Sequence, residues 1–222
     1  MKKNLKVLGL ALVAIMAMSA VISAVAQAES PTFVLTAATG KFKGSSNDHI
    51  FTVQGGNVKC VENGGVKGAR FEGTLTAEKS TEVTVTAAYG NAGKGCTAFG
   101  VAATVNMKSC HYRFTAVKGS NPPTALVDVI CTTAGDEITV TASSLPCTVT
   151  VGPQTGLIHA LLTNAGPEPT HVNAEITVGK IKYTASGVGC PKPGTFEDGS
   201  YTGTVTLEGF DTTGKKVGLH IV

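Results

Sequence analysis

The chain has 222 residues, a formal net charge of +3, 42% hydrophobic residues and six cysteines, but no tryptophan. Its basic first six residues, an apolar run at 7–25 and Ala26-Gln27-Ala28 follow one another in the order of a secretory signal peptide. Removal of residues 1–28 would leave 222 − 28 = 194 residues with 18 − 3 = 15 basic and 15 acidic side chains, because three lysines leave with the signal. This balanced charge argues against binding to nucleic acids or other polyanions, which depends on clustered Lys and Arg.

After the signal-peptide helix, the chain alternates apolar and β-branched polar residues in short runs. These runs are at residues 74–77, 82–86, 138–141, 148–151 and 204–207. A period of two predicts strands with Val and Leu facing a core and Thr facing water. Clusters of Gly, Asn, Asp and Pro separate the runs, so the pattern predicts an all-β antiparallel sandwich or barrel. Only residues 156–163 could form a helical turn or two.

An internal repeat divides the mature chain. The first copy of its motif consists of Tyr89, Gly93, Gly95 and Cys96, and the second of Tyr183, Gly187, Gly189 and Cys190. A chance match of the Tyr and both Gly before a given Cys has odds of roughly one in a few thousand. The alternative is a coincidence between similar low-complexity runs. We expect two related β units, 29–134 and 135–222, either as separate domains or packed as one body.

The even number of cysteines in an exported chain predicts three disulfides. A zinc site is the less favoured alternative, because no C-x-x-C pair occurs and the nearest cysteines are fourteen positions apart. Self-contained units, and a hairpin of residues 110–117 and 125–131 that brings its two ends together, favour one pairing. The expected disulfides are Cys60–Cys96, Cys147–Cys190 and Cys110–Cys131. Six cysteines allow fifteen pairings, so the other pairings remain an alternative.

Candidate catalytic and metal-binding residues are sparse. The histidines are scattered singly, without an H-E-x-x-H motif; they are His49, His111, His159, His171 and His220. The residue types of a hydrolase triad occur in Asp48-His49 and the nearby Ser45 and Ser46, but no G-x-S-x-G motif surrounds a serine. We therefore predict no catalytic residue, no metal and no cofactor.

Two acidic pairs could serve as glycosidase carboxylates or as calcium ligands. They are Asp136-Glu137 and Glu197-Asp198, and each is next to a glycine in a stretch typical of a solvated turn. No D-x-D-x-D-G loop is present. These pairs are expected to be turn residues, and an enzyme would need Asp48 and His49, or Glu197 and Asp198, to converge in one cleft.

The four tyrosines, Tyr89, Tyr112, Tyr183 and Tyr201, are the remaining candidates for a binding surface. Tyr89 and Tyr183 occupy equivalent places in the repeat, and we expect each to pack over its own disulfide and to hydrogen-bond nearby backbone. The motif glycines are expected to allow positive φ before Cys96 and Cys190. A sugar-binding platform is disfavoured because tryptophan is absent.

Three runs carry a resemblance to known proteins: residues 1–14, Gly95-Cys96-Thr97-Ala98-Phe99-Gly100 and Ala103-Thr104-Val105-Asn106-Met107. With them the chain resembles a group of uncharacterised, cysteine-containing, β-rich secreted proteins of soil actinobacteria, over most of its length. In composition and unit size it is also similar to the neocarzinostatin-type apoproteins, which are disulfide-bonded immunoglobulin-like sandwiches that carry a small molecule in a cleft. None of their motifs matches residue by residue, so this second likeness implies only a sandwich fold.

These observations predict a secreted, non-catalytic extracellular protein with a structural, adhesion or partner-binding role in the cell envelope. No second apolar run approaches the length of a membrane span, so release or noncovalent association with the envelope is expected. The alternative is a carrier with an apolar cleft for a small ligand, and the third hypothesis is a secreted hydrolase. The partner itself cannot be named from the sequence.

Overall fold

The computed structural model describes residues 30–46, 48–62, 67–90, 95–166 and 171–222. The expected signal peptide and Gly93 lie outside these ranges. Within them every regular element is a β-strand and all strand pairs are antiparallel, which confirms the all-β prediction. Residues 156–163 belong to strand β14, because pairing with strands on both sides outweighs their local preference for a turn. No helix able to cross a membrane is found in the described part of the chain.

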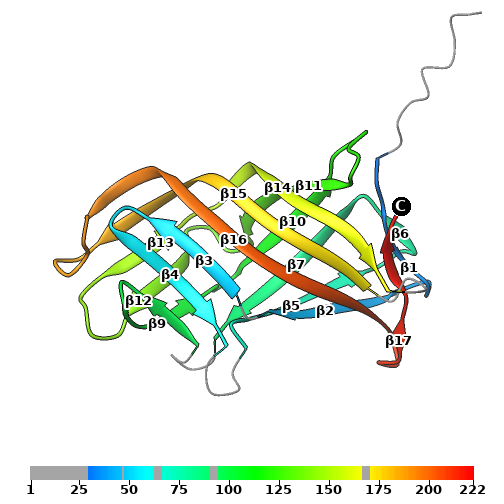
Figure 1. Cartoon of the computed structure of the whole chain (residues 1–222), viewed down its shortest axis with the longest axis horizontal. Helices are drawn as coiled ribbons and strands as arrows, with labels where there is room; N and C mark the ends of the chain where they lie inside the picture. The colour runs from blue at the N-terminus through cyan, green and yellow to red at the C-terminus, as the bar shows by residue number, and fades with distance from the viewer. Residues whose placement is uncertain (1–29, 47, 63–66, 91–94, 167–170) are drawn as a thin grey trace, which may run out of the picture.

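Most strands belong to one large sheet that closes on itself twice (Figure 1). The first closed ring consists of β2 (Gly40–Ser46), β5 (Ala69–Leu75), β7 (Glu82–Tyr89), β10 (Cys110–Ala116), β11 (Thr124–Cys131), β14 (Gln154–Ala165), β15 (His171–Ser186) and β16 (Gly194–Asp211). These eight described strands form a barrel in which each strand pairs with the next and β16 returns to β2.

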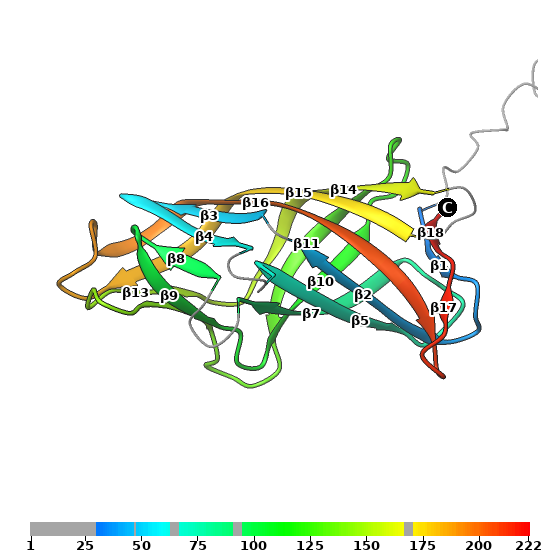
Figure 2. The ribbon, with the colours of Figure 1, turned by 60° about the horizontal axis from the view of Figure 1, so that its bottom comes forward.

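A second ring uses the same two long strands. It consists of β3 (Asp48–Val53), β4 (Gly56–Val61), β8 (Cys96–Ala98), β9 (Val101–Asn106), β12 (Ile138–Ala142), β13 (Thr148–Val151), β15 and β16. Along its length β16 pairs first with β3 and then with β2, while β15 pairs first with β14 and then with β13. The two barrels therefore lie end to end and share the β15–β16 hairpin (Figures 1 and 2).

A small sheet lies at the end of the first ring. It consists of β18 (Leu219–Ile221), β1 (Phe33–Leu35) and β6 (Lys79–Ser80), in that order, and β17 (Lys216–Val217) pairs nearby with β16. Leu35 and Leu219 are almost completely buried, and Leu35 lies close to Gly40 and Gly209 of the ring strands. The small sheet thus covers apolar side chains at this end of the barrel.

The predicted alternation places the core inside the rings. In β5, residues Ala69, Phe71, Gly73 and Leu75 are buried, and the residues between them are exposed. In β7 the valines and Ala87 are buried, whereas the threonines face outward. Side chains that alternate across a closed sheet must point either into the barrel or into solvent. Thr therefore lies mainly outside, as the sequence pattern predicts.

The three disulfides join Cys60 to Cys96, Cys110 to Cys131 and Cys147 to Cys190. These pairs coincide with those expected from the repeat and the hairpin. Cys60 and Cys96 are directly opposite one another on β4 and β8, and Cys110 and Cys131 are opposite on β10 and β11. The first two bonds therefore join neighbouring strands, whereas Cys147 directly precedes β13 and Cys190 lies between β15 and β16.

The sheet order crosses the expected boundary at residue 134. Each ring takes strands from both 29–134 and 135–222, because β15 pairs with β13 and β14 of the second range, whereas β16 pairs with β2 and β3 of the first. The two motif tyrosines also occupy different elements, Tyr89 at the end of β7 and Tyr183 within β15. Strand pairing is not limited to neighbouring segments, so a sequence repeat need not form a spatial unit.

Candidate functional site

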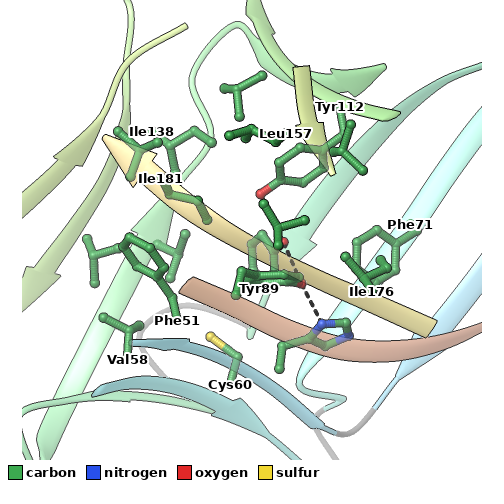
Figure 3. A pocket seen from close by; sticks show the side chains of 18 of the residues that line it. Phe51, Val58, Cys60, Phe71, Tyr89, Tyr112, Ile138, Leu157, Ile176 and Ile181 are labelled. Carbon is green, nitrogen blue, oxygen red and sulfur yellow. Dashed lines mark hydrogen bonds between the residues drawn. The ribbon is translucent and has the colours of Figure 1, made fainter. Parts of the chain in front are cut away.

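The strongest candidate site is an internal cavity where the two rings meet. Its volume is about 100 Å³, and its lining side chains come from both rings and from the shared strands (Figure 3). The first ring contributes Phe71, Tyr89, Tyr112 and Leu157, the second contributes His49, Phe51 and Ile138, and the shared strands contribute Ile176, Val178 and Tyr201. Nearly all of the lining side chains are aliphatic or aromatic, so the cavity is apolar with a single polar cluster.

Strand alternation aims the polar cluster inward. Tyr112 and Phe114 are two positions apart on β10 and both line the cavity. Arg113 between them is on the other face, where its guanidinium bonds the Asp128 carboxylate at 2.6 Å. On β16 the corresponding inward positions are Tyr201 and Gly203. The strand pattern by itself therefore determines which of these side chains can meet inside the barrel.

A glycine makes room for the histidine of the cluster. Gly203 lies directly opposite His49 in the pairing of β16 with β3. A Cβ atom at this position would stand 2.2 Å from Nδ1 of His49, which is closer than any side chain tolerates. The imidazole therefore lies over the glycine backbone, with only 2% of the residue exposed, and stacks near Tyr201.

Three tyrosine hydroxyls and the imidazole form a continuous hydrogen-bond chain. The hydroxyl of Tyr89 lies 3.0 Å from that of Tyr112 and 3.1 Å from that of Tyr201. The Tyr201 hydroxyl in turn lies 2.5 Å from Nδ1 of His49. Tyr112 and Tyr89 point toward one another across the cavity in Figure 3. Nε2 of His49 is closed off from solvent and has no hydrogen-bond partner.

Burial keeps all four groups of this chain uncharged near neutral pH. It raises the pKa of Tyr89, Tyr112 and Tyr201 well above the usual 10.0. Electrostatic repulsion from a neighbouring tyrosine raises each pKa further, whereas the hydrogen bond with Tyr112 lowers that of Tyr89 and the hydrogen bond with Tyr89 lowers that of Tyr201. Burial also lowers the pKa of His49 from 6.5 to about 4, against the smaller opposing effect of the Asp48 carboxylate. A low-dielectric site disfavours the charged form of each group. The cluster is therefore a set of neutral donors and acceptors.

The low pKa of His49 predicts that stability falls in mild acid. Between pH 6.5 and about 4 the unfolded chain binds a proton at this residue while the folded protein does not, so the free energy of unfolding decreases as pH falls. From pH 7 to pH 4.5 we expect this one group to lower it by roughly 2.5 kcal/mol. Urea unfolding at the two pH values measures the change.

A matched variant isolates the contribution of His49 from that of the carboxylates. In His49→Gln the imidazole is absent, so the loss of stability between pH 7 and pH 4.5 should be smaller by roughly 2.5 kcal/mol. An equal pH dependence in both proteins would show that His49 is protonated as readily in the fold as in the unfolded chain.

The residues considered for a hydrolase do not converge. Successive residues of a strand face opposite sides, so Asp48 is exposed on the outside whereas His49 is buried in the cavity. Ser45 is also on the outer face, and Ser46 accepts a hydrogen bond from the backbone of Asp48. The imidazole is bonded to Tyr201 instead of to a carboxylate. Asp48 and Ser45 therefore face solvent, whereas His49 and Ser46 are buried.

The acidic pairs also stay apart from the cavity. Glu197 forms an exposed ion pair with Lys182 at 2.8 Å, and Asp198 accepts a hydrogen bond from the Tyr183 hydroxyl. Asp136 lies 3.9 Å from the ammonium of Lys108. The other histidines lie on different strands, namely His111 on β10, His159 on β14, His171 on β15 and His220 on β18. Within the described ranges, no group of three or more His, Cys, Asp or Glu could hold a metal ion.

The roles expected for the repeat residues hold only in part. Gly95 and Gly187 have positive φ, of 80° and 113°. Gly189 instead lies against the ring of Pro146, where a Cβ atom would be 2.6 Å from Cδ. Tyr183 accepts a hydrogen bond from the backbone of Gln54, which is 129 residues away in the sequence. Among the described residues, Tyr89 bonds two tyrosine side chains and no local backbone, since it faces the cavity.

Sequence reasoning singled out the tyrosines but not their convergence with His49. Tyr201 and the histidine are 152 residues apart, and the four members come from β3, β7, β10 and β16. The sequence signal for these residues was the alternation along each strand, which indicates that each of the four side chains faces the inside of the barrel. Alternation predicts on which side of the sheet a residue lies, but only the order of the strands shows which inward-facing residues meet.

No protein-family model, no curated protein and no solved structure matches this chain. The resemblance to secreted actinobacterial proteins therefore stays a prediction.

Proposed function

We propose that this protein is an exported, non-catalytic carrier that binds one small, largely apolar molecule in the cavity between its two rings. The observation that carries the proposal is the apolar cavity of about 100 Å³, which is lined by side chains of both barrels and contains one cluster of hydrogen-bonding groups. Ligand sites are typically apolar concavities with a few polar groups that orient the ligand. An eight-stranded barrel is just wide enough to be filled by side chains or to hold one small ligand.

The size of the cavity sets the size of the ligand. A dry, apolar cavity of about 150 Å³ in another protein binds benzene, so a space of this order suits a molecule of one ring or less. The lining of Phe71, Leu157, Ile176 and similar side chains favours an apolar body. Three disulfides are consistent with an oxidising extracellular compartment, and this supports export. Association of the carrier with the envelope is tested by measuring the protein in wall and medium fractions.

Filling the cavity is expected to abolish binding. Val178→Phe places a ring into the cavity from β15, and we expect the affinity for benzene and other one-ring probes to fall more than about tenfold. Thr177→Phe is the matched control, because it adds a ring at the neighbouring outward-facing position. Binding is measured by the ligand-induced rise in melting temperature and by NMR titration of the oxidised protein.

Two further observations complete this test. Val178→Ile adds a single methylene and should weaken binding less than Val178→Phe, while perturbing the fold less. Native mass spectrometry of the purified protein should show an additional mass that corresponds to one bound molecule of one-ring size. Equal binding by the wild type and Val178→Phe would contradict the proposed site, and no binding of any one-ring probe to the wild type would contradict the proposed function.

A further inference from the structure

The hydrogen-bond chain in the cavity has a direction that follows from counting protons. Each tyrosine hydroxyl carries one proton, and a neutral imidazole carries one proton on one of its two nitrogens. The phenol is the stronger acid and the imidazole nitrogen the stronger base, so Tyr201 donates to Nδ1 of His49. Tyr89 must then donate to Tyr201, and Tyr112 must donate to Tyr89.

This direction makes Tyr112 the accepting end of the chain. Its proton is used by Tyr89, whereas its oxygen lone pairs receive no hydrogen bond from the other members. Tyr112 lines the cavity and points toward its interior in Figure 3. The remaining imidazole proton is on Nε2 of His49, which has almost no accessible surface. Among the described members of this chain, a ligand therefore meets an acceptor oxygen and no free hydroxyl proton.

Resting on the proposed function, we propose that the cavity selects uncharged molecules of one-ring size that carry a hydrogen-bond donor, an N–H or O–H group. Such a donor would bond the Tyr112 oxygen while the apolar body packs against the aliphatic lining. A ligand whose polar group only accepts hydrogen bonds would lose its hydration and face the lone pairs of Tyr112 without compensation. Carboxylates and other anions would be disfavoured further, because the tyrosines and His49 are neutral.

In this proposal His49 is a positioning residue that acts through two tyrosines. As the terminal acceptor, it draws the proton of Tyr201, and this orients the protons of Tyr89 and Tyr112 in turn. Without the Tyr201 hydroxyl, Tyr89 has no acceptor on that side and can donate to Tyr112 instead. The Tyr112 proton then becomes available to the cavity, and the selectivity of the site should change toward accepting ligands.

Three small rings of similar shape test the proposal. Pyrrole only donates a hydrogen bond, pyridine only accepts one, and thiophene does neither to a useful extent. Their dissociation constants are measured by NMR titration at pH 8, where His49 is neutral. The dissociation constant of each ring is divided by that of thiophene for the same protein. This ratio is then compared between wild type and variant, so that the hydration free energy of the unbound ring cancels. A single neutral hydrogen bond corresponds to a factor of roughly 2 to 12.

The expected results differ between two isosteric variants. In Tyr112→Phe the advantage of pyrrole over thiophene should fall by a factor of roughly 2 to 12, because the accepting oxygen is gone. In Tyr201→Phe binding of pyridine relative to thiophene should improve by at least about twofold. Tyr183→Phe is the matched control, since this buried hydroxyl bonds Gln54 and Asp198 away from the cavity, and neither ratio should change.

The outcomes separate the selectivity from the function itself. If the wild type binds all three rings but Tyr112→Phe leaves the pyrrole-to-thiophene ratio unchanged, the proposed selectivity is overturned and the carrier function stands. A wild-type preference for pyridine would also overturn it, because the chain would then have the opposite direction. If no ring binds to the wild type, the carrier function itself is overturned.

Discussion

Replacing Phe42 by alanine is expected to lower the free energy of unfolding by about 3–5 kcal/mol, which is the largest effect of any single substitution considered. Phe42 lies on β2 inside the first ring and is only 2% exposed. Its ring fills the space left by Gly73 on β5, where a Cβ atom would stand 2.0 Å from Cζ. The surrounding strands belong to a closed barrel and can collapse only partly, so the substitution leaves a cavity. Urea unfolding at pH 7 measures the loss.

The same experiment tests whether the two rings unfold together. Both rings contain β15 and β16, so loss of the first ring removes two strands from the second. We therefore expect one transition in Phe42→Ala, shifted to lower urea and seen equally by every probe. Ile138→Ala, on β12 of the second ring, should shift the same single transition by about 2–5 kcal/mol.

Two separate transitions, with each variant moving only one, would contradict this coupling and show that the rings are independent units. Thr74→Ala serves as the outward-facing control on β5 and should change stability by no more than about 0.5 kcal/mol. The coupling bears on function, because the cavity has walls from both rings. A ligand that occupies it should stabilise the whole molecule.

Removal of the Cys147–Cys190 disulfide by double substitution with serine is expected to cost about 4 kcal/mol. The two cysteines are 43 positions apart, and the bond restricts the unfolded chain over that whole loop. The Cys110–Cys131 bond closes a loop of 21 positions, so its removal should cost less, about 3 kcal/mol. Guanidinium unfolding of the two double variants, both fully oxidised at the remaining bonds, measures the difference.

The order of the two losses is the informative result. A larger loss for Cys110–Cys131 would show that contacts in the folded hairpin outweigh the restriction of the unfolded chain. Peptide mapping under non-reducing conditions should first find the pairs of the structure, Cys60–Cys96, Cys110–Cys131 and Cys147–Cys190, in the wild type. A bond between members of different pairs would contradict the structure itself.

Strand parity explains how much of the site could be predicted. The alternation in residues 82–86 predicts a strand with Val inside and Thr outside, and β7 has this arrangement. Alternation also places Tyr112 and Tyr201 on the inner face of their strands, but no feature of the neighbouring sequence predicts that the two tyrosines belong to one cluster. The adjacent Asp48 and His49 suggested catalytic partners, but alternation sends them to opposite faces. Neighbouring position in a strand is therefore evidence against a shared site.

The six cysteines form three specific disulfides in the structure. A repeat in the sequence and a hairpin with facing ends favoured the pairs that the structure contains. The repeat was less informative about architecture, because both rings take strands from each side of residue 134. Disulfide pairing depends on which strand ends are neighbours, whereas ring closure depends on the order of every strand in the sheet.

The sequence by itself determined the all-β class, the inward and outward faces of most strands and the small net charge of the chain, because each of these is local or additive. Only the tertiary structure decided that one long hairpin, β15–β16, serves two barrels and that His49 meets Tyr201 from 152 residues away. Backbone hydrogen bonds have the same chemistry for every residue, so they do not specify which strands pair. Which strands pair is decided by the packing of the whole core, and the cavity lies where the two barrels formed by this pairing meet.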